Sequence, residues 1–283
     1  MAGALREAKR LRLDTVQIFT KNQQQWRVPP LTDEACEEWT REQSALGWGG
    51  RTVAHASYLI NLASPDDELW EKSVSLMEEE IRRCEALGVA FLVHHPGAFT
   101  TSTLDEGLGR IAKAYARLLE RTRGFRTVSC LENTAGGGST IGREFAELAR
   151  LRELIVDRTG TEGAARVGIC FDTCHAHAAG YDMSSYDAAN RSLDEFGRVC
   201  GFEHLRVLHL NDSKAKMGSR LDRHEHIGKG TIGLEGFRGV LNRPELRGVP
   251  RPMIMETPKG ENEAGTSHDT LNLRRLRKLV EEI

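Results

Sequence analysis

Short apolar runs with the character of β-strands recur along this chain at an almost constant spacing. They begin near residues 15, 52, 90, 127, 167, 206 and 252, about 37 to 46 residues apart. The stretches between them carry apolar residues at helical spacing, as in Trp70, Val74, Met77 and Ile81, which share one face before Gly88. Strands that alternate with helices at a steady period are typical of βα units around a parallel sheet.

A closed (β/α)8 barrel of the TIM type needs one strand more than these seven. Residues 2–13 have the pattern of the helix that should follow the first strand, so we expect that strand to lie upstream of Met1. Its absence would leave backbone N–H and C=O groups unpaired, and a form extended upstream should therefore be more stable. No linker or change of composition divides the chain, and we expect a single domain over residues 1–283.

The composition excludes several other classes of protein. No apolar run approaches the ~18 residues of a membrane span, and the first residues lack the apolar core of a signal peptide. The six cysteines follow no disulfide rhythm and no CxxC pair is present, which indicates reduced thiols without a cysteine-bound metal. We expect a cytoplasmic protein that does not associate with membranes.

Polar residues with the chemistry of metal ligands stand at or just past the ends of six apolar runs. These residues are His55, His95, Glu132, Asp172, His175, His209, Asp222, His224 and Glu256. Imidazole nitrogens and carboxylate oxygens are ligands of zinc and similar divalent ions, and a bound ion would offset the cost of desolvating them. Because a βα-barrel gathers the carboxyl ends of its strands in one pocket, the pattern predicts a metal centre there.

The net charge also bears on what the pocket binds. The chain has a formal charge of −2, and some of the acids counted in it are the candidate ligands. Two or three bound dications would make the loaded protein net positive, with that charge concentrated in the pocket, which suits a polyanionic partner.

Two glycine-rich motifs are open to other interpretations. Gly228-Lys-Gly-Thr-Ile-Gly233 has the G-x-G-x-x-G spacing, but it follows a polar segment and not a strand, which argues against a dinucleotide site. The run from Gly136 to Gly138 lacks the Lys of a P-loop, so it either forms a turn or lets the backbone approach a bulky ligand.

Several longer motifs closely resemble the endonuclease IV family of apurinic/apyrimidinic endonucleases. They are His55-Ala-Ser-Tyr58, Glu132-Asn-Thr-Ala-Gly, Asp172-Thr-Cys-His175, His209-Leu-Asn-Asp-Ser-Lys and Gly218-Ser-Arg-Leu-Asp222-Arg-His224, with Phe19-Thr-Lys-Asn22-Gln-Gln-Gln-Trp26 near the start. The resemblance runs from about residue 2 to the last helix. In that family a TIM barrel holds three zinc ions and cuts DNA at abasic sites.

The resemblance divides the nine candidate ligands into three sets. It implies that His55, His95 and Glu132 bind one Zn²⁺, and that Glu132 bridges to a second ion. The second ion would also take Asp172, His209 and Glu256, and the third would take His175, Asp222 and His224. Glu132 is thus the expected catalytic residue, and Mn²⁺ or Fe²⁺ could replace Zn²⁺ at one or more sites. His94, His177, His204, His226 and His268 match no ligand position.

The resemblance also implies the substrate and its contacts. The expected substrate is double-stranded DNA with abasic sites or blocked 3′ ends, cut by a monomeric, prokaryotic enzyme of the hydrolase class. The DNA-binding residues would be Asn22, Gln24, Gln25, Tyr58 and Arg223. Gln24 stands where well-known family members carry Arg, and Tyr58 has the alternative of being a packed aromatic at the barrel mouth. Hydrolysis requires no Schiff-base lysine, so Lys21, Lys214 and Lys229 are expected to be phosphate contacts or plain surface residues.

Two rival functions remain at this stage. A metal-dependent sugar isomerase or epimerase of the xylose-isomerase-like barrels would use Glu132, Asp172, His209 and Glu256, but leaves the other candidate ligands without a task. A DNA-damage binding protein without catalytic activity would result if an incomplete barrel lost its metals.

Overall fold

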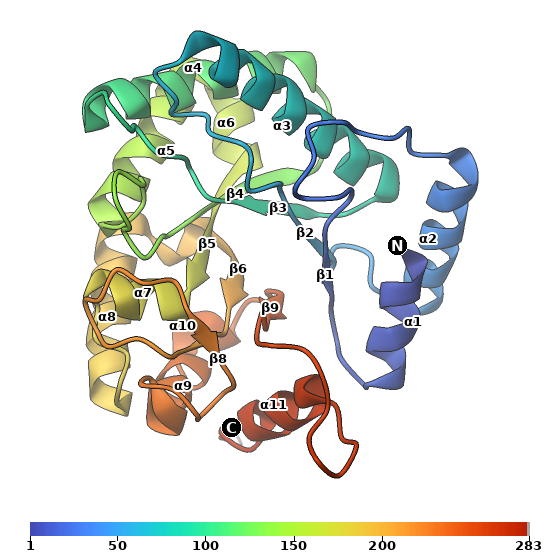
Figure 1. The fold of residues 1–283 in the computed structure, drawn as a ribbon, viewed down its shortest axis with the longest axis vertical. Helices are drawn as coiled ribbons and strands as arrows, with labels where there is room; N and C mark the ends of the chain where they lie inside the picture. Colours follow the sequence, from blue (N-terminus) through green and yellow to red (C-terminus); the bar gives the residue numbers. More distant parts are fainter. Residues whose placement is uncertain (282–283) are drawn as a thin grey trace.

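The computed structural model describes residues 1–281, and in it seven parallel strands form one curved sheet with helices outside (Figure 1). The strands of this sheet, in their spatial order, are β1 Gln17–Ile18, β2 Val53–His55, β3 Phe91–His94, β4 Val128–Glu132, β5 Val167–Asp172, β6 Leu205–His209 and β9 Met253–Ile254. Each neighbouring pair is parallel. The alternation and the number of strands predicted from the sequence are therefore confirmed.

The helices return the chain from one strand to the next. They are α1 Ala2–Arg10, α2 Asp33–Ala45, α3 Asp67–Leu87, α4 Leu104–Arg121, α5 Phe145–Thr159, α6 Thr161–Arg166, α7 Thr173–Ala179, α8 Tyr186–Cys200, α9 Gly233–Leu241, α10 Pro244–Arg247 and α11 His268–Arg277, with a 3-10 turn η1 at Phe202–His204. A short antiparallel hairpin pairs β7 Asp212–Ser213 with β8 His224–Glu225. Within residues 1–281 no helix is both long and apolar enough to cross a membrane.

Local sequence signals set the ends of the longest helices. The Asp66 side chain accepts the backbone N–H of Leu69 at the start of α3, and Gly88 ends that helix with a φ of +63°, a conformation that glycine adopts without a Cβ clash. Thr103 and Glu106 form a reciprocal capping box at the start of α4. These caps agree with the helix predicted to stop at Gly88.

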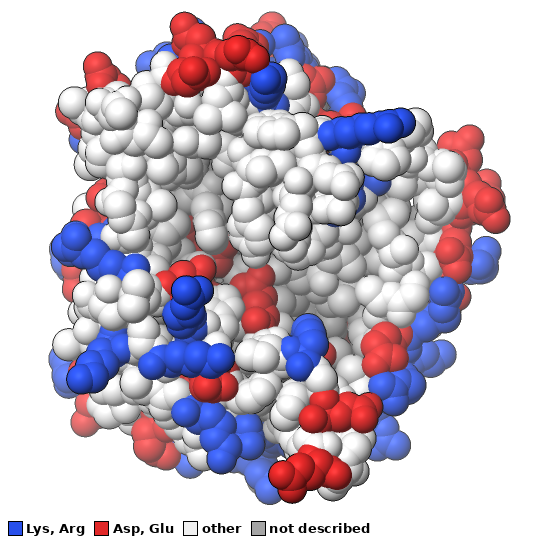
Figure 2. Space-filling view, in the orientation of Figure 1, with Lys and Arg blue, Asp and Glu red and all other residues white. Residues whose placement is uncertain are grey.

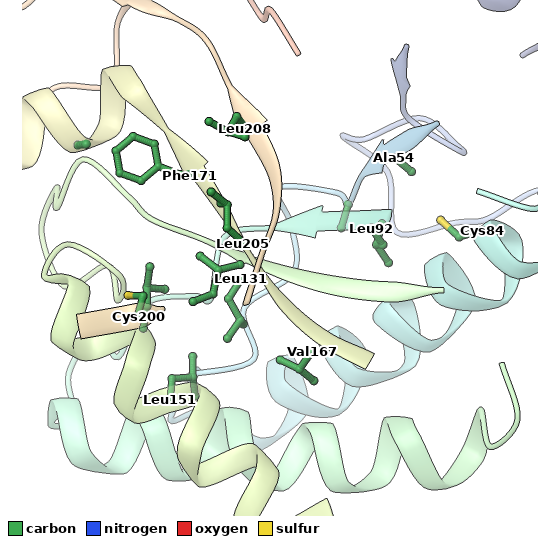
Figure 3. Packing of buried hydrophobic residues seen from close by; sticks show 14 of the residues in the cluster. Ala54, Cys84, Leu92, Leu131, Leu151, Val167, Phe171, Cys200, Leu205 and Leu208 are labelled. Carbon is green, nitrogen blue, oxygen red and sulfur yellow. The ribbon is translucent and has the colours of Figure 1, made fainter. Parts of the chain in front are cut away.

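Two apolar layers hold the barrel together. The larger layer lies between the sheet and the helices, where side chains such as Leu131, Phe171 and Leu208 pack (Figure 3). The smaller layer fills the barrel interior with Val53, Val93, Cys130, Cys170, Val207 and Ile254. All six cysteines are free thiols, as the sequence predicted.

The barrel is open between its two edge strands. Among the described residues β1 and β9 do not pair with each other, and a cavity of about 1390 Å³ separates them. Residues of α1 and α11 line this cavity together with both edges (Figure 1). The Gln17 side chain crosses the opening at one end, where Nε2 donates to Glu256 Oε1 at 2.6 Å.

Candidate metal centre

The nine candidate ligands converge on one pocket at the carboxyl ends of the strands. His55, Glu132, Asp172 and His209 are the last residues of β2, β4, β5 and β6. Since parallel strands of a barrel present their carboxyl ends on one face, these side chains meet there. The face drawn in Figure 2 is hollowed near its centre, with acidic side chains in the hollow and Lys and Arg side chains on its lower rim.

The Glu132 carboxylate stands at the centre and faces two groups at once. Its Oε2 lies 3.2 Å from His55 Nε2 and 3.3 Å from His95 Nε2. Its Oε1 lies 2.7 Å from His209 Nδ1 on the opposite side. The side chain is fully buried. A carboxylate placed in this way can give one oxygen to each of two neighbouring cations.

A second group surrounds the Oε1 side of Glu132. Asp172, His209 and Glu256 each bring a potential ligand atom, and together with Glu132 these atoms all lie within 4.8 Å of one another. His209 Nδ1 is 3.1 Å from Glu256 Oε2 and 3.8 Å from Asp172 Oδ2. One cation could therefore contact three carboxylates and one imidazole here.

A third group lies beside the second. Asp222 Oδ2 is 3.2 Å from His175 Nε2, and Asp222 Oδ1 is 3.1 Å from His224 Nε2. His224 Nε2 is buried and has no hydrogen-bond partner among the described residues. A buried nitrogen without a partner is costly in a folded protein, and a cation would satisfy it. The donor atoms present thus fit a metal centre.

The ring orientation of four histidines is fixed from outside the pocket. In each, one ring nitrogen contacts a backbone or amide oxygen acceptor, which leaves the other nitrogen unprotonated when the ring is neutral. The contacts are His55 Nδ1 to Ala56 O at 2.8 Å, His175 Nδ1 to Asn133 O at 2.9 Å, His209 Nε2 to Gln17 Oε1 at 2.9 Å and His224 Nδ1 to Glu256 O at 3.3 Å.

Charges in the pocket are strongly coupled. Burial opposes ionisation of Glu132, but His209 and the hydrogen bonds from His209, His55 and His95 hold its pKa well below the usual range. Burial likewise opposes protonation of His224, yet the nearby carboxylates of Asp222 and Asp172 raise its pKa to about 9. The acids thus require positive charge nearby, which either imidazolium groups or metal cations supply.

Several polar residues that support the site were not identified from the sequence. Asn211 Nδ2 donates to Asp172 Oδ2 at 2.6 Å, and Asn211 Oδ1 accepts the backbone N–H of Glu256 at 2.7 Å. Gln17 contacts both His209 and Glu256. Asn211 follows the His209 strand end closely, so its position was a usable signal, whereas nothing local distinguishes Gln17. Such partners orient metal ligands and tune their basicity.

The residues predicted to contact DNA lie at the rim of the pocket. We call residues 19–29, after β1, and residues 56–60, after β2, the rim loops. Asn22, Gln24, Gln25, Tyr58 and Arg223 are exposed. Tyr58 is 57% exposed, while its ring centroid lies 5.1 Å from that of His55 and 5.9 Å from that of Phe19. Tyr58 is therefore packed along one edge and open on its other side.

The prediction for Lys21 was wrong. Its side chain is only 1% exposed, so it is neither a plain surface residue nor a phosphate contact. The ammonium donates to the carbonyl oxygens of Asn22 at 3.1 Å and Gln25 at 2.9 Å. The loop folds back over its own lysine, a tertiary contact that the sequence does not reveal. Lys214 and Lys229 are exposed.

The remaining histidines make other contacts in the structure. Both ring nitrogens of His94 have an oxygen partner: Nδ1 contacts the backbone oxygen of His95, and Nε2 contacts the Tyr115 hydroxyl. His177 Nδ1 accepts the backbone N–H of Met183, and His226 stacks on His268 with ring centroids 4.3 Å apart. None of these rings belongs to a group of potential metal ligands within the described part of the chain.

Comparison with known proteins gives one consistent family. A family model described as a xylose isomerase-like TIM barrel matches residues 5–276. A probable endonuclease 4 of Chloroflexus aurantiacus is 45% identical over 269 residues, which cover 95% of this chain and 90% of that protein. A crystal structure of endonuclease IV from Thermus thermophilus superposes with a TM-score of 0.81 at 38% identity, covering 98% of this chain and 93% of the other. A D-tagatose 3-epimerase-like protein shares the fold, with a TM-score of 0.71 over 99% of this chain and 92% of its own, at only 16% identity.

Proposed function

This chain belongs to the endonuclease IV family of xylose isomerase-like TIM barrels, and on that premise we propose that it is a zinc-dependent hydrolase that incises DNA at abasic sites. The cut falls at the phosphodiester 5′ to the abasic deoxyribose and leaves a 3′-hydroxyl and a 5′-deoxyribose phosphate. Removal of groups that block 3′ ends is the second activity of the same pocket, because the same phosphodiester chemistry applies there.

The arrangement around Glu132 is the observation that carries this proposal. Both of its oxygens face potential ligands, and a third group of ligands lies within the same pocket. A sugar isomerase of the same fold would use only the quartet of Glu132, Asp172, His209 and Glu256. It gives no task to His55 and His95, or to the group formed by His175, Asp222 and His224, so it is the weaker candidate.

Different residues of the chain would hold the metal ions and orient the ligands for phosphodiester hydrolysis. Divalent ions, when bound, lower the pKa of water from ~15.7 toward ~7 and neutralise charge on the phosphate. Glu132 would hold two ions close together, with His55 and His95 on one side and His209 on the other. The outer contacts of the histidines and the amides of Gln17 and Asn211 keep these ligands oriented, so no side chain has to act as general base.

Recognition of damage rests on the rim loops. An abasic nucleotide has lost its stacking, so extruding it from the duplex costs less than extruding an intact nucleotide. Side chains that fill the resulting gap then stabilise the bent duplex. Tyr58 and the amides of Gln24 and Gln25 are exposed at the rim and suited to this task. Gln24 supplies no charge for a phosphate, so shape and stacking dominate its contribution.

The proposal is tested by the metal content and the products of the same purified protein. We expect elemental analysis to give about three zinc per chain, and a duplex with one tetrahydrofuran abasic mimic to be cut on its 5′ side with a 3′-hydroxyl end. One or two Mn, Mg or Co per chain without incision would favour the isomerase. Bound abasic duplex without incision would indicate a damage-binding protein.

Replacing Tyr58 by Ala separates recognition from chemistry. Because base–aromatic stacking is worth about 1–3 kcal/mol, we expect the preference for abasic over intact duplex to fall by about 10-fold or more, with zinc content unchanged. Binding of both duplexes measured by fluorescence anisotropy checks this. An equal loss of affinity for the two duplexes would show that Tyr58 serves only to pack the barrel mouth.

A further inference from the structure

A buried ionic cluster lies outside the metal centre, beneath the two rim loops. Its members are Glu80 and Arg83 of α3 and Lys21 of the first rim loop, with side chains 2%, 7% and 1% exposed. Burial of three charges is costly unless each is paired and hydrogen-bonded. None of the three lies in a group of potential metal ligands among the described residues.

The Glu80 carboxylate contacts both rim loops at once. Its Oε2 accepts the Thr20 hydroxyl at 2.6 Å, and its Oε1 accepts the backbone N–H of Ser57 at 3.2 Å. The same Oε1 lies 3.8 Å from Lys21 Nζ. Thr20 belongs to the first rim loop and Ser57 immediately precedes Tyr58 in the second. One side chain of α3 therefore fixes the base of each loop.

Lys21 and Arg83, the charged neighbours of Glu80, make further hydrogen bonds to the backbone of the first rim loop. Lys21 donates to two carbonyl oxygens of the loop, those of Asn22 and Gln25. Arg83 Nη1 donates to the carbonyl oxygen of Pro29 at 3.0 Å, farther along the same loop.

The two rim loops are also linked directly. Ser57 Oγ donates to the carbonyl oxygen of Gln23 at 2.6 Å. The backbone that carries Gln24, Gln25 and Tyr58 is thus held from below at several points, while these three side chains remain exposed above.

We propose that Glu80 is a positioning residue that holds the two rim loops in register, so that their exposed side chains fit the gap of an abasic duplex together. The inference rests on the proposed function, because it gives the rim loops the task of recognising DNA. Glu80 itself is buried and belongs to no group of potential metal ligands among the described residues. Its two carboxylate oxygens accept from a hydroxyl and a backbone N–H and lie near an ammonium group, and an ionised carboxylate suits all three partners.

Replacing Glu80 by Gln tests this role with little change of volume. We expect KM for the abasic duplex to rise about 10-fold and its preference over intact duplex to fall by a similar factor, because a charge-assisted anchor is lost. Zinc content should stay unchanged and kcat should stay within about 2-fold, because the metal ligands are untouched. Glu68→Gln, on the exposed part of the same helix, is the matched control and should change none of these values.

Limited trypsin digestion measures how accessible the first rim loop is, and it does so without DNA. The Lys21 side chain is buried in the wild type, so cleavage after Lys21 should be slow, and it should become faster in Glu80→Gln but not in Glu68→Gln. A variant that lost kcat and zinc together with unchanged digestion would overturn the proposal. If the wild type failed to incise abasic DNA, the proposed function would fail while the digestion would still report on the anchor.

Thr20→Val provides a second variant in case Glu80→Gln does not fold. It removes the hydrogen bond from the Thr20 hydroxyl to Glu80, and we expect smaller changes of KM, of the preference for abasic duplex and of the digestion rate in the same direction. Where Glu80→Gln does fold, the double variant should be little worse than Glu80→Gln alone, because the two residues share one hydrogen bond. Additive effects, or a Thr20→Val protein with wild-type KM and digestion, would contradict the proposal.

Discussion

Replacing Glu132 by Gln should abolish incision of abasic DNA while the barrel stays folded. The amide has nearly the same volume, but it replaces one carboxylate oxygen by an NH₂ group. That group then faces either the Nε2 atoms of His55 and His95 or Nδ1 of His209, where it can donate a hydrogen bond but cannot bind a cation. Several kcal/mol of charge stabilisation would be lost, so we expect kcat to fall by about 10³-fold or more.

The measurements must separate loss of chemistry from loss of fold. Thermal unfolding and circular dichroism should match the wild type, and elemental analysis should show that at least one metal per chain is lost. Glu120→Gln, an exposed residue on α4, is the matched control and should retain full activity. Near-normal turnover by Glu132→Gln with full metal content would contradict the bridged arrangement.

The fold and the convergence of the candidate ligands could be predicted because both depend on local patterns. The strand period and the caps of α3 follow from neighbouring residues, and the ligands stand at strand ends that the barrel topology brings together. The edge strands were less well defined. The run that begins near residue 15 forms only Gln17–Ile18, since it has a partner on one side alone among the described residues.

Contacts across the barrel could not be predicted in this way. Gln17 and Glu256 are 239 residues apart in sequence, and neither carries a motif that would pair them. Lys21 and Glu80 are separated by most of two βα units, and only the folded loop shows that the lysine points inward. These long-range polar contacts orient the side chains and loops of the site. They are therefore the part of the site that the structure reveals and the sequence does not.

The second large effect is expected at Asp212, a fully buried acid in β7. Its carboxylate accepts five backbone N–H groups at 2.8 to 3.4 Å, those of Ser213, Gly228, Gly230, Ile232 and Gly233. The glycine N–H groups of the G-x-G-x-x-G segment thus donate to a protein carboxylate. Gly230 has no room for a Cβ, which would collide with the Ser213 backbone. The loop at 228–233 is wrapped around Asp212, and β8 beside it carries His224.

Replacing Asp212 by Asn should therefore destabilise the protein. Because Asp212 is fully buried, the charges at the surface stay the same. One amide oxygen remains an acceptor, but the NH₂ group meets two backbone N–H groups that lose their partner, and we expect the free energy of unfolding to fall by about 3 kcal/mol. Urea denaturation measures this, and the amides of Gly228 and Gly230 should exchange hydrogen faster. Asp157→Asn, exposed on α5, should leave the midpoint unchanged. Since β7 pairs with the strand that carries His224, metal binding by His175, Asp222 and His224 should also weaken. An unchanged urea midpoint and unchanged hydrogen exchange would contradict the prediction, because they would show that water or a neighbouring acceptor replaces the carboxylate.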